Sequence, residues 1–211
     1  MTFKSGLFDR VQNSRIHHED AKAEAKLASE LISHLPLLTS RPIVVVCIGT
    51  DRSTGDSLGP LVGSFLEEKR SPSFHIYGTL DDPIHAVNLE EKLKEITEKH
   101  FNPFILAIDA CLGRFKSVGI IQVCDGPVKP GAGVNKELPE VGDMHITGIV
   151  NVSGFMEFFV LQNTRLSLVV KMAKTIANGI HLASKYQYNQ LGWSEIRWNR
   201  ETGAAINEQT T

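Results

Sequence analysis

The chain has 211 residues, a formal net charge of −2 at pH 7 and a hydrophobic content of 42%. This balance leaves no excess of lysine and arginine to neutralise a phosphate backbone, so we expect no nucleic-acid partner. No stretch reaches the ~18 apolar residues of a membrane span, and residues 1–20 hold no apolar run typical of a signal peptide. We therefore expect a cytoplasmic protein without a membrane partner, of a length that suits one domain.

Alternating helical and strand patterns follow a polar start. In chain order they are a helix in 18–35, a strand in 41–50, a helix in 58–70, a strand in 73–79, a helix in 88–100, strands in 103–110 and 119–127, and a helix in 164–186. Residues 155–163 fit either a strand or a helix. The alternation predicts an α/β fold in three layers, with a mostly parallel sheet and helices on both faces.

The predicted domain boundaries follow from composition. Residues 1–18 are polar and aperiodic, which predicts a flexible N-terminal arm. A single domain is expected over residues 19–190, and residues 191–211 are expected to form a C-terminal tail. Within the domain, residues 129–143 are rich in glycine and proline, which predicts a long loop of the kind that often has a function.

Aspartates follow two of the predicted strands. Asp51 and Asp56 come after the first strand, and Asp109 is expected at the end of the third, where ligands of such sheets bind. Two carboxyl groups in one crevice favour a state in which one keeps its proton while the other is charged, as in an acid–base pair. Asp56 could instead cap the helix that begins near Leu58, and Asp51 fits a turn.

Three further features could take part in chemistry. His145 follows the long loop and could hold a divalent metal together with the two strand-end aspartates, or be an ordinary hydrogen-bonded histidine. Cys111 could be a nucleophile with His145 as its base, or a packed structural thiol. Gly131 and Gly133 could let backbone N–H groups approach a substrate, or form a plain turn.

Four segments together resemble the YyaC family of proposed spore proteases: CIGTDRSTGDSLGP, AIDACLG, PGAGVNKELPEVGDMHITG and VNVSGFMEFFVLQNTRLSLV. The resemblance spans about residues 40–185. That family is similar to the germination protease, which degrades small acid-soluble spore proteins, and to the endopeptidases that mature nickel hydrogenases. The resemblance implies a phosphorylase/hydrolase-like α/β fold.

The resemblance extends to individual positions. The germination protease motif, an aspartate followed by a small residue and Leu-Gly-Pro, matches residues 56–60, and its second catalytic aspartate matches Asp109. Its Pro-Gly-x-Gly-Val pattern matches residues 130–134. The metal-contacting residues of the hydrogenase-maturation group fall on Asp56, Asp109 and His145. No propeptide is evident, so self-activation is not carried over.

The resemblance implies a peptidase of sporulation or germination, located in the forespore or spore interior. Its catalytic residues would be Asp56 and Asp109, its substrate a protein or peptide such as a small acid-soluble spore protein, and no cofactor would be required. One alternative is a maturation-type endopeptidase with nickel or zinc on the two aspartates and His145. Another is a catalytically inactive binding or regulatory protein on the same fold. A homo-oligomer is compatible with all three.

Overall fold

The computed structural model describes residues 14–36, 41–131 and 138–201, with side chains described as far as Gln190. Its centre is a six-stranded sheet in the order β1-β5-β6-β4-β2-β3. The strands are β1 (Ser14–His17), β2 (Ile43–Cys47), β3 (Phe74–Tyr77), β4 (Phe104–Gly113), β5 (Ile120–Asp125) and β6 (Met144–Val152). The pairs β3–β2, β2–β4 and β4–β6 are parallel, while β5 runs antiparallel to both of its neighbours.

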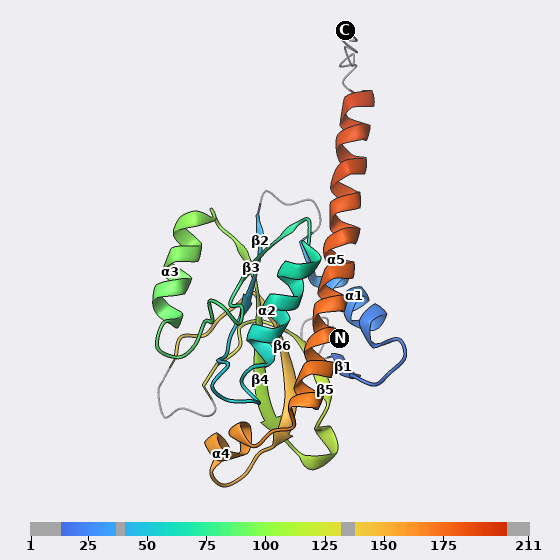
Figure 1. Cartoon of the computed structure of the whole chain (residues 1–211). Coiled ribbons are helices and arrows are strands. Elements are labelled where there is room, and N and C mark those ends of the chain that lie inside the picture. Colours follow the sequence, from blue (N-terminus) through green and yellow to red (C-terminus); the bar gives the residue numbers. More distant parts are fainter. Residues whose placement is uncertain (1–13, 37–40, 132–137, 202–211) are drawn as a thin grey trace, which may run out of the picture.

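Helices cover both faces of this sheet (Figure 1). They are α1 (Ala23–His34), α2 (Leu58–Lys69), α3 (Leu89–Lys99), α4 (Glu157–Gln162) and α5 (Leu166–Glu201), with a short 3-10 helix η1 (Phe115–Ser117). Helices α1, α2 and α5 pack together over one face, and α3 lies over the other. The predicted α/β class, with a mostly parallel sheet between helices, is confirmed. In the described segments, no helix combines the length and the apolar character needed to cross a bilayer.

Strand β2 is buried on both faces of the sheet. All five of its side chains are buried, because alternate residues point into two separate cores. Val44 and Val46 pack in the same cluster as Ile96 of α3, while Val45 and Cys47 belong to the core under α1, α2 and α5. An uninterrupted β-branched run is what a parallel strand covered on both faces requires.

The structure differs from the sequence-based expectations in the sheet. Residues 14–17, which we placed in the flexible arm, form the edge strand β1, in which only Ile16 is buried. Such a short edge strand has too few apolar residues to show a period of two. Strand β6 was missed altogether, although it lies between β4 and β5. Its interior Gly148 and the preceding glycine-rich loop hid its strand pattern.

Two other differences concern helices. Residues 157–162, in the segment that fitted either element, form the helix α4. Helix α5 continues to Glu201, through the first part of the predicted tail, and extends away from the sheet (Figure 1). The rest of the predicted arm, residues 1–13, and the rest of the predicted tail, residues 202–211, lie outside the described residues.

Candidate active site

The loop between β2 and α2 carries Asp56 and is folded over the end of β2. The Gly49 N–H donates to the Ile84 carbonyl (2.7 Å), and the Thr50 N–H donates to the carbonyl of Asp56 (3.2 Å). Gly49 has a φ of 149°, and a Cβ atom there would lie 2.0 Å from the Asp56 carbonyl oxygen. Only glycine permits this approach, which brings Asp56 back beside the strand end.

Asp56 is not the cap of the following helix. Ser57 occupies the N-cap position of α2, and its hydroxyl donates to the Thr54 carbonyl at 2.7 Å. The capping alternative for Asp56 is therefore wrong. Its half-buried carboxyl faces a cavity instead.

We had expected Asp109 at the end of its strand, but it lies within β4. The partner strand β2 stops at Cys47, opposite Ile108, so β4 continues past it with Asp109 paired to Thr147 of β6. The end of β2 and the protruding part of β4 therefore lie side by side at the carboxyl edge of the parallel strands, where ligands of open α/β sheets bind in a crevice. One carboxyl oxygen of Asp109 accepts a hydrogen bond from the Ala110 N–H at 2.9 Å.

Both aspartates line one cavity of about 720 Å³ at this crevice. Its walls come from the loops after β2 and β3, from β4, from the start of the long loop and from α4. Much of the lining is apolar: Ala86, Val87, Leu138, Phe158 and Leu161. A cavity of this size, with a few polar groups in an apolar wall, suits a small molecule or a short stretch of peptide.

The cavity changes how the two carboxyl groups hold protons. The pKa of Asp109 is raised to about 8, mainly because its carboxyl is buried; the Ala110 N–H opposes this rise and the charge of Asp56 adds to it. The pKa of Asp56 is also raised by burial, and the Ser53 side chain opposes that rise. Asp109 therefore keeps its proton at neutral pH, and Asp56 is the member of the pair that ionises first.

Ser53 adds a buried polar group to the same cavity. It is only 4% exposed and lies on the cavity lining. Its hydroxyl affects the pKa of Asp56, yet it finds no partner of good hydrogen-bond geometry among the described residues. A buried hydroxyl without a partner costs free energy, so this group is available to water or to a ligand.

His145 is not brought to the two aspartates. It pairs with Ala107 of β4, two positions before the Asp109–Thr147 pair, and its Nδ1 lies 2.8 Å from the Gly126 carbonyl oxygen. It is absent from the cavity lining, and no group of three metal-ligating side chains occurs in the described part of the chain. The predicted metal-ligand set does not fit this arrangement, so we derive no step through a metal.

The other residues proposed from the sequence also differ in whether they line the cavity. Cys111 lines the cavity, but burial raises the pKa of its thiol to about 11, although the Thr147 side chain opposes the rise. A protonated thiol is a poor nucleophile. Asp51 is exposed and accepts a hydrogen bond from the Thr50 hydroxyl (3.5 Å), in keeping with a turn. Gly131 lines the cavity, whereas Gly133 lies outside the described residues.

Sequence reasoning missed two ionisable residues of the cavity, Arg52 in the loop after β2 and His85. His85 lies in the loop between β3 and α3, beyond the end of a strand that the sequence did predict. The signal was available, because each loop that follows the carboxyl end of a parallel strand borders the same edge of the sheet. His85 was overlooked because it lies well beyond Tyr77, where β3 ends.

Comparison with known proteins identifies the family to which the chain belongs. It belongs to the family described as "Protein of unknown function (DUF1256)", whose model matches residues 15–179. One relative is the Uncharacterized protein YyaC of Bacillus subtilis (strain 168), with 57% identity over 192 residues, which cover 90% of this chain and 94% of that protein. The resemblance to the YyaC family is therefore confirmed.

One solved structure with a related shape is that of the NiFe hydrogenase maturation protease HycI from Thermococcus kodakarensis KOD1. The two chains are 19% identical, with a TM-score of 0.46, and the similarity covers 70% of this chain and 95% of that one.

Proposed function

We propose that the protein is a peptidase that hydrolyses a peptide bond of a protein or peptide partner through Asp56 and Asp109. The observation that carries this proposal is the placement of both carboxyl groups in one cavity, with the pKa of Asp109 raised to about 8. A carboxylic acid and a carboxylate that line the same cavity are the groups that acid–base hydrolysis needs.

In the proposed reaction the Asp56 carboxylate takes a proton from a water molecule, and the oxygen of that water forms a bond to the carbonyl carbon of the substrate. The protonated Asp109 donates to the carbonyl oxygen, which carries the developing negative charge. The bond between carbon and nitrogen then breaks, and the leaving nitrogen receives a proton from the pair. The products are a carboxylic acid and an amine, which together contain the atoms of the peptide and one water.

We propose further that the substrate is a spore protein, with small acid-soluble spore proteins as candidates, and that the reaction takes place in the forespore or spore interior. The support is the match of residues 56–60 and of Asp109 to the motifs of the germination protease. The volume and apolar walls of the cavity suit an extended peptide segment rather than a folded surface.

The test is a search for new chain ends. A peptide pool from Bacillus subtilis spores, with its amino groups blocked, is incubated with the wild type or with the Asp56→Asn/Asp109→Asn variant. Asparagine is nearly isosteric with aspartate but cannot ionise. We expect mass spectrometry to find new free amino termini with the wild type alone. Peptides that bind to the wild type but stay uncut would contradict the proposal and favour the binding-protein alternative.

A further inference from the structure

His85 is held directly beside the loop of Asp56. The preceding residue, Ile84, forms a parallel bridge with Ile48 just after β2, and its carbonyl accepts the Gly49 N–H at 2.7 Å. The half-buried His85 side chain lines the same cavity as the two aspartates. The loop after β2, the loop after β3 and strand β4 therefore bring Asp56, His85 and Asp109 to one cavity.

The hydrogen bonding of the His85 ring indicates which nitrogen carries the proton. The Val87 N–H donates to Nδ1 at 3.3 Å, so Nδ1 acts as an acceptor. In a neutral imidazole the other nitrogen, Nε2, then carries the hydrogen. Among the described residues Nε2 has no hydrogen-bond partner, which leaves an N–H donor at the cavity wall.

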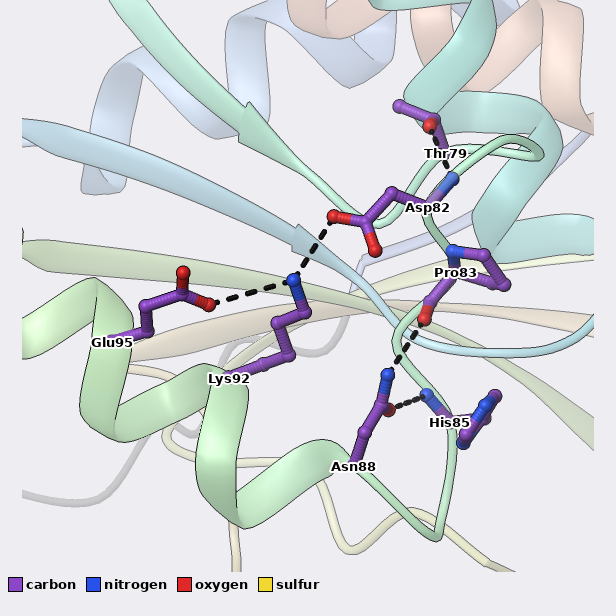
Figure 2. A network of polar contacts seen from close by, with 7 residues as sticks. All are labelled: Thr79, Asp82, Pro83, His85, Asn88, Lys92 and Glu95. Atoms are coloured by element: carbon purple, nitrogen blue, oxygen red, sulfur yellow. Dashed lines mark hydrogen bonds and ion pairs between the residues drawn. The ribbon is translucent and has the colours of Figure 1, made fainter.

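Asn88 fixes the backbone that presents this ring (Figure 2). Its Oδ1 accepts from the His85 N–H at 2.8 Å, and its Nδ2 donates to the Pro83 carbonyl at 3.0 Å. The side-chain amide thus closes the turn between Pro83 and the start of α3. Asn88 therefore helps to fix the backbone from which the His85 ring projects.

A second set of contacts anchors the same loop to α3 (Figure 2). The Asp82 N–H donates to the Thr79 hydroxyl at 3.1 Å, and the Asp82 carboxylate accepts from Lys92 of α3 at 3.0 Å. Lys92 also lies 3.4 Å from Glu95. Exposed ion pairs contribute little to stability by themselves, but the Asp82–Lys92 pair connects the loop that holds His85 to α3.

We propose that His85 is a substrate-binding residue, whose Nε2–H donates a hydrogen bond to a backbone carbonyl oxygen of a peptide in the cavity, with Asn88 as its positioning residue. The inference rests on the proposed function, because it takes the ligand to be a peptide. The carbonyl groups of a bound peptide need hydrogen-bond donors, and His85 would add one to those of Arg52, Ser53 and the protonated Asp109 on the same lining. The adjacent apolar walls suit a bulky apolar side chain beside that carbonyl.

The probe is the blocked pentapeptide acetyl-Ala-Ala-Phe-Ala-Ala-amide, added to the Asp56→Asn/Asp109→Asn protein so that no turnover occurs. Long-range proton–nitrogen NMR of the histidine rings should show the Nε2–H form for His85 and a shift of its Nε2 signal as the peptide binds. His85→Ala should raise the Kd about tenfold, the usual effect of one lost hydrogen bond. His85→Gln, which keeps an N–H donor, should restore most of the affinity, and Asn88→Ala should weaken binding.

His17 supplies the matched control. Its Nδ1 accepts the Glu19 N–H at 3.2 Å, the same local arrangement, but it lies on the edge strand β1 and is absent from the cavity lining. His17→Ala should therefore leave the Kd unchanged. An unchanged Kd in His85→Ala, or no shift of the His85 signal with the peptide, would overturn the inference.

The two proposals can fail separately. If the peptide binds through His85 but the wild type cuts nothing in the spore peptide pool, the hydrolysis proposal falls and the His85 contact stands. If the wild type cuts the pool and His85→Ala has the same KM and kcat, the His85 contact falls and hydrolysis stands.

Discussion

Asp56 and Asp109 have the same side chain, and their surroundings give them different chemistry. Asp56 comes from a glycine-shaped loop, whereas Asp109 lies within a strand, and both side chains are partly exposed on the cavity lining. Burial is the larger cause of the raised pKa at both positions. The sequence could predict that the two aspartates would lie at one edge of the sheet, because each was expected to follow a buried strand. It could not predict which of them keeps the proton, because that depends on packing around the carboxyl group.

The first prediction concerns stability and Asp109. Its folded-state pKa is raised to about 8 from an unfolded value of about 3.9, so ionisation of the buried carboxyl opposes folding. Stability is then full below about pH 4 and falls as pH rises through 8, because over this range only the folded state holds the proton. The Asp109→Asn variant has no ionisable group at this position, so it should not lose stability in this way. Between about pH 5 and pH 9, the free energy of unfolding measured in urea should fall by a few kcal/mol more in the wild type than in Asp109→Asn. Equal falls in the two proteins would contradict this prediction.

The second prediction concerns Cys111. With its pKa raised to about 11, the thiol is protonated at neutral pH despite its place on the cavity lining. Cys111→Ala should therefore leave the cleavage rate of the wild type unchanged, and iodoacetamide should modify Cys111 slowly at pH 7.5 in the folded protein. Loss of cleavage in Cys111→Ala, with an unchanged free energy of unfolding, would point to a thiol nucleophile instead.

At the scale of elements, helix α2 approaches the sheet so closely that it requires glycine. A Cβ atom on Gly59 would lie 2.1 Å from the Ile48 carbonyl oxygen, and one on Gly63 would lie 2.1 Å from that of Gly78. These contacts hold the start of α2, and with it the Asp56 loop, against the strand ends. The sequence pattern predicted α2 and β2 as elements. It could not predict β6, because Gly148 within that strand is needed for the neighbouring Leu58 and weakens the strand signal.

The third prediction tests this close packing. Alanine in place of glycine usually stabilises a helix by about 0.5–1 kcal/mol. At Gly59 the sign should reverse, since the new methyl group would meet backbone atoms, and we expect a loss of about 1–3 kcal/mol, typical of overpacking. Gly154→Ala is the control, because no atom lies within 4 Å of its added Cβ. Denaturant unfolding that gave the two variants the same free energy would count against the packing argument.

At the scale of the whole molecule, strand order decides which residues meet. Because β4 lies between β2 and β6, Asp109 is next to the loop of Asp56 on one side and to Thr147 on the other. The sequence suggested that His145 would lie near the same crevice. In the structure His145 pairs with Ala107, two positions before Asp109 along β4, and so lies away from the aspartates. His85 enters because the loop after β3 folds over the end of β2. Local patterns predict elements, whereas lateral order and register arise from the whole chain.

The most direct test of the acid–base pair is the pH dependence of kcat/KM between about pH 5 and pH 10, for the spore peptide that the wild type cuts fastest. If protonated Asp109 is the acid, kcat/KM should fall as pH rises through about 8, the value to which burial raises its pKa. Asp109→Asn should lower kcat/KM at least about a hundredfold and abolish this descending limb. A wild-type kcat/KM that stays level up to about pH 10, or an Asp109→Asn variant with the wild-type profile, would contradict the account.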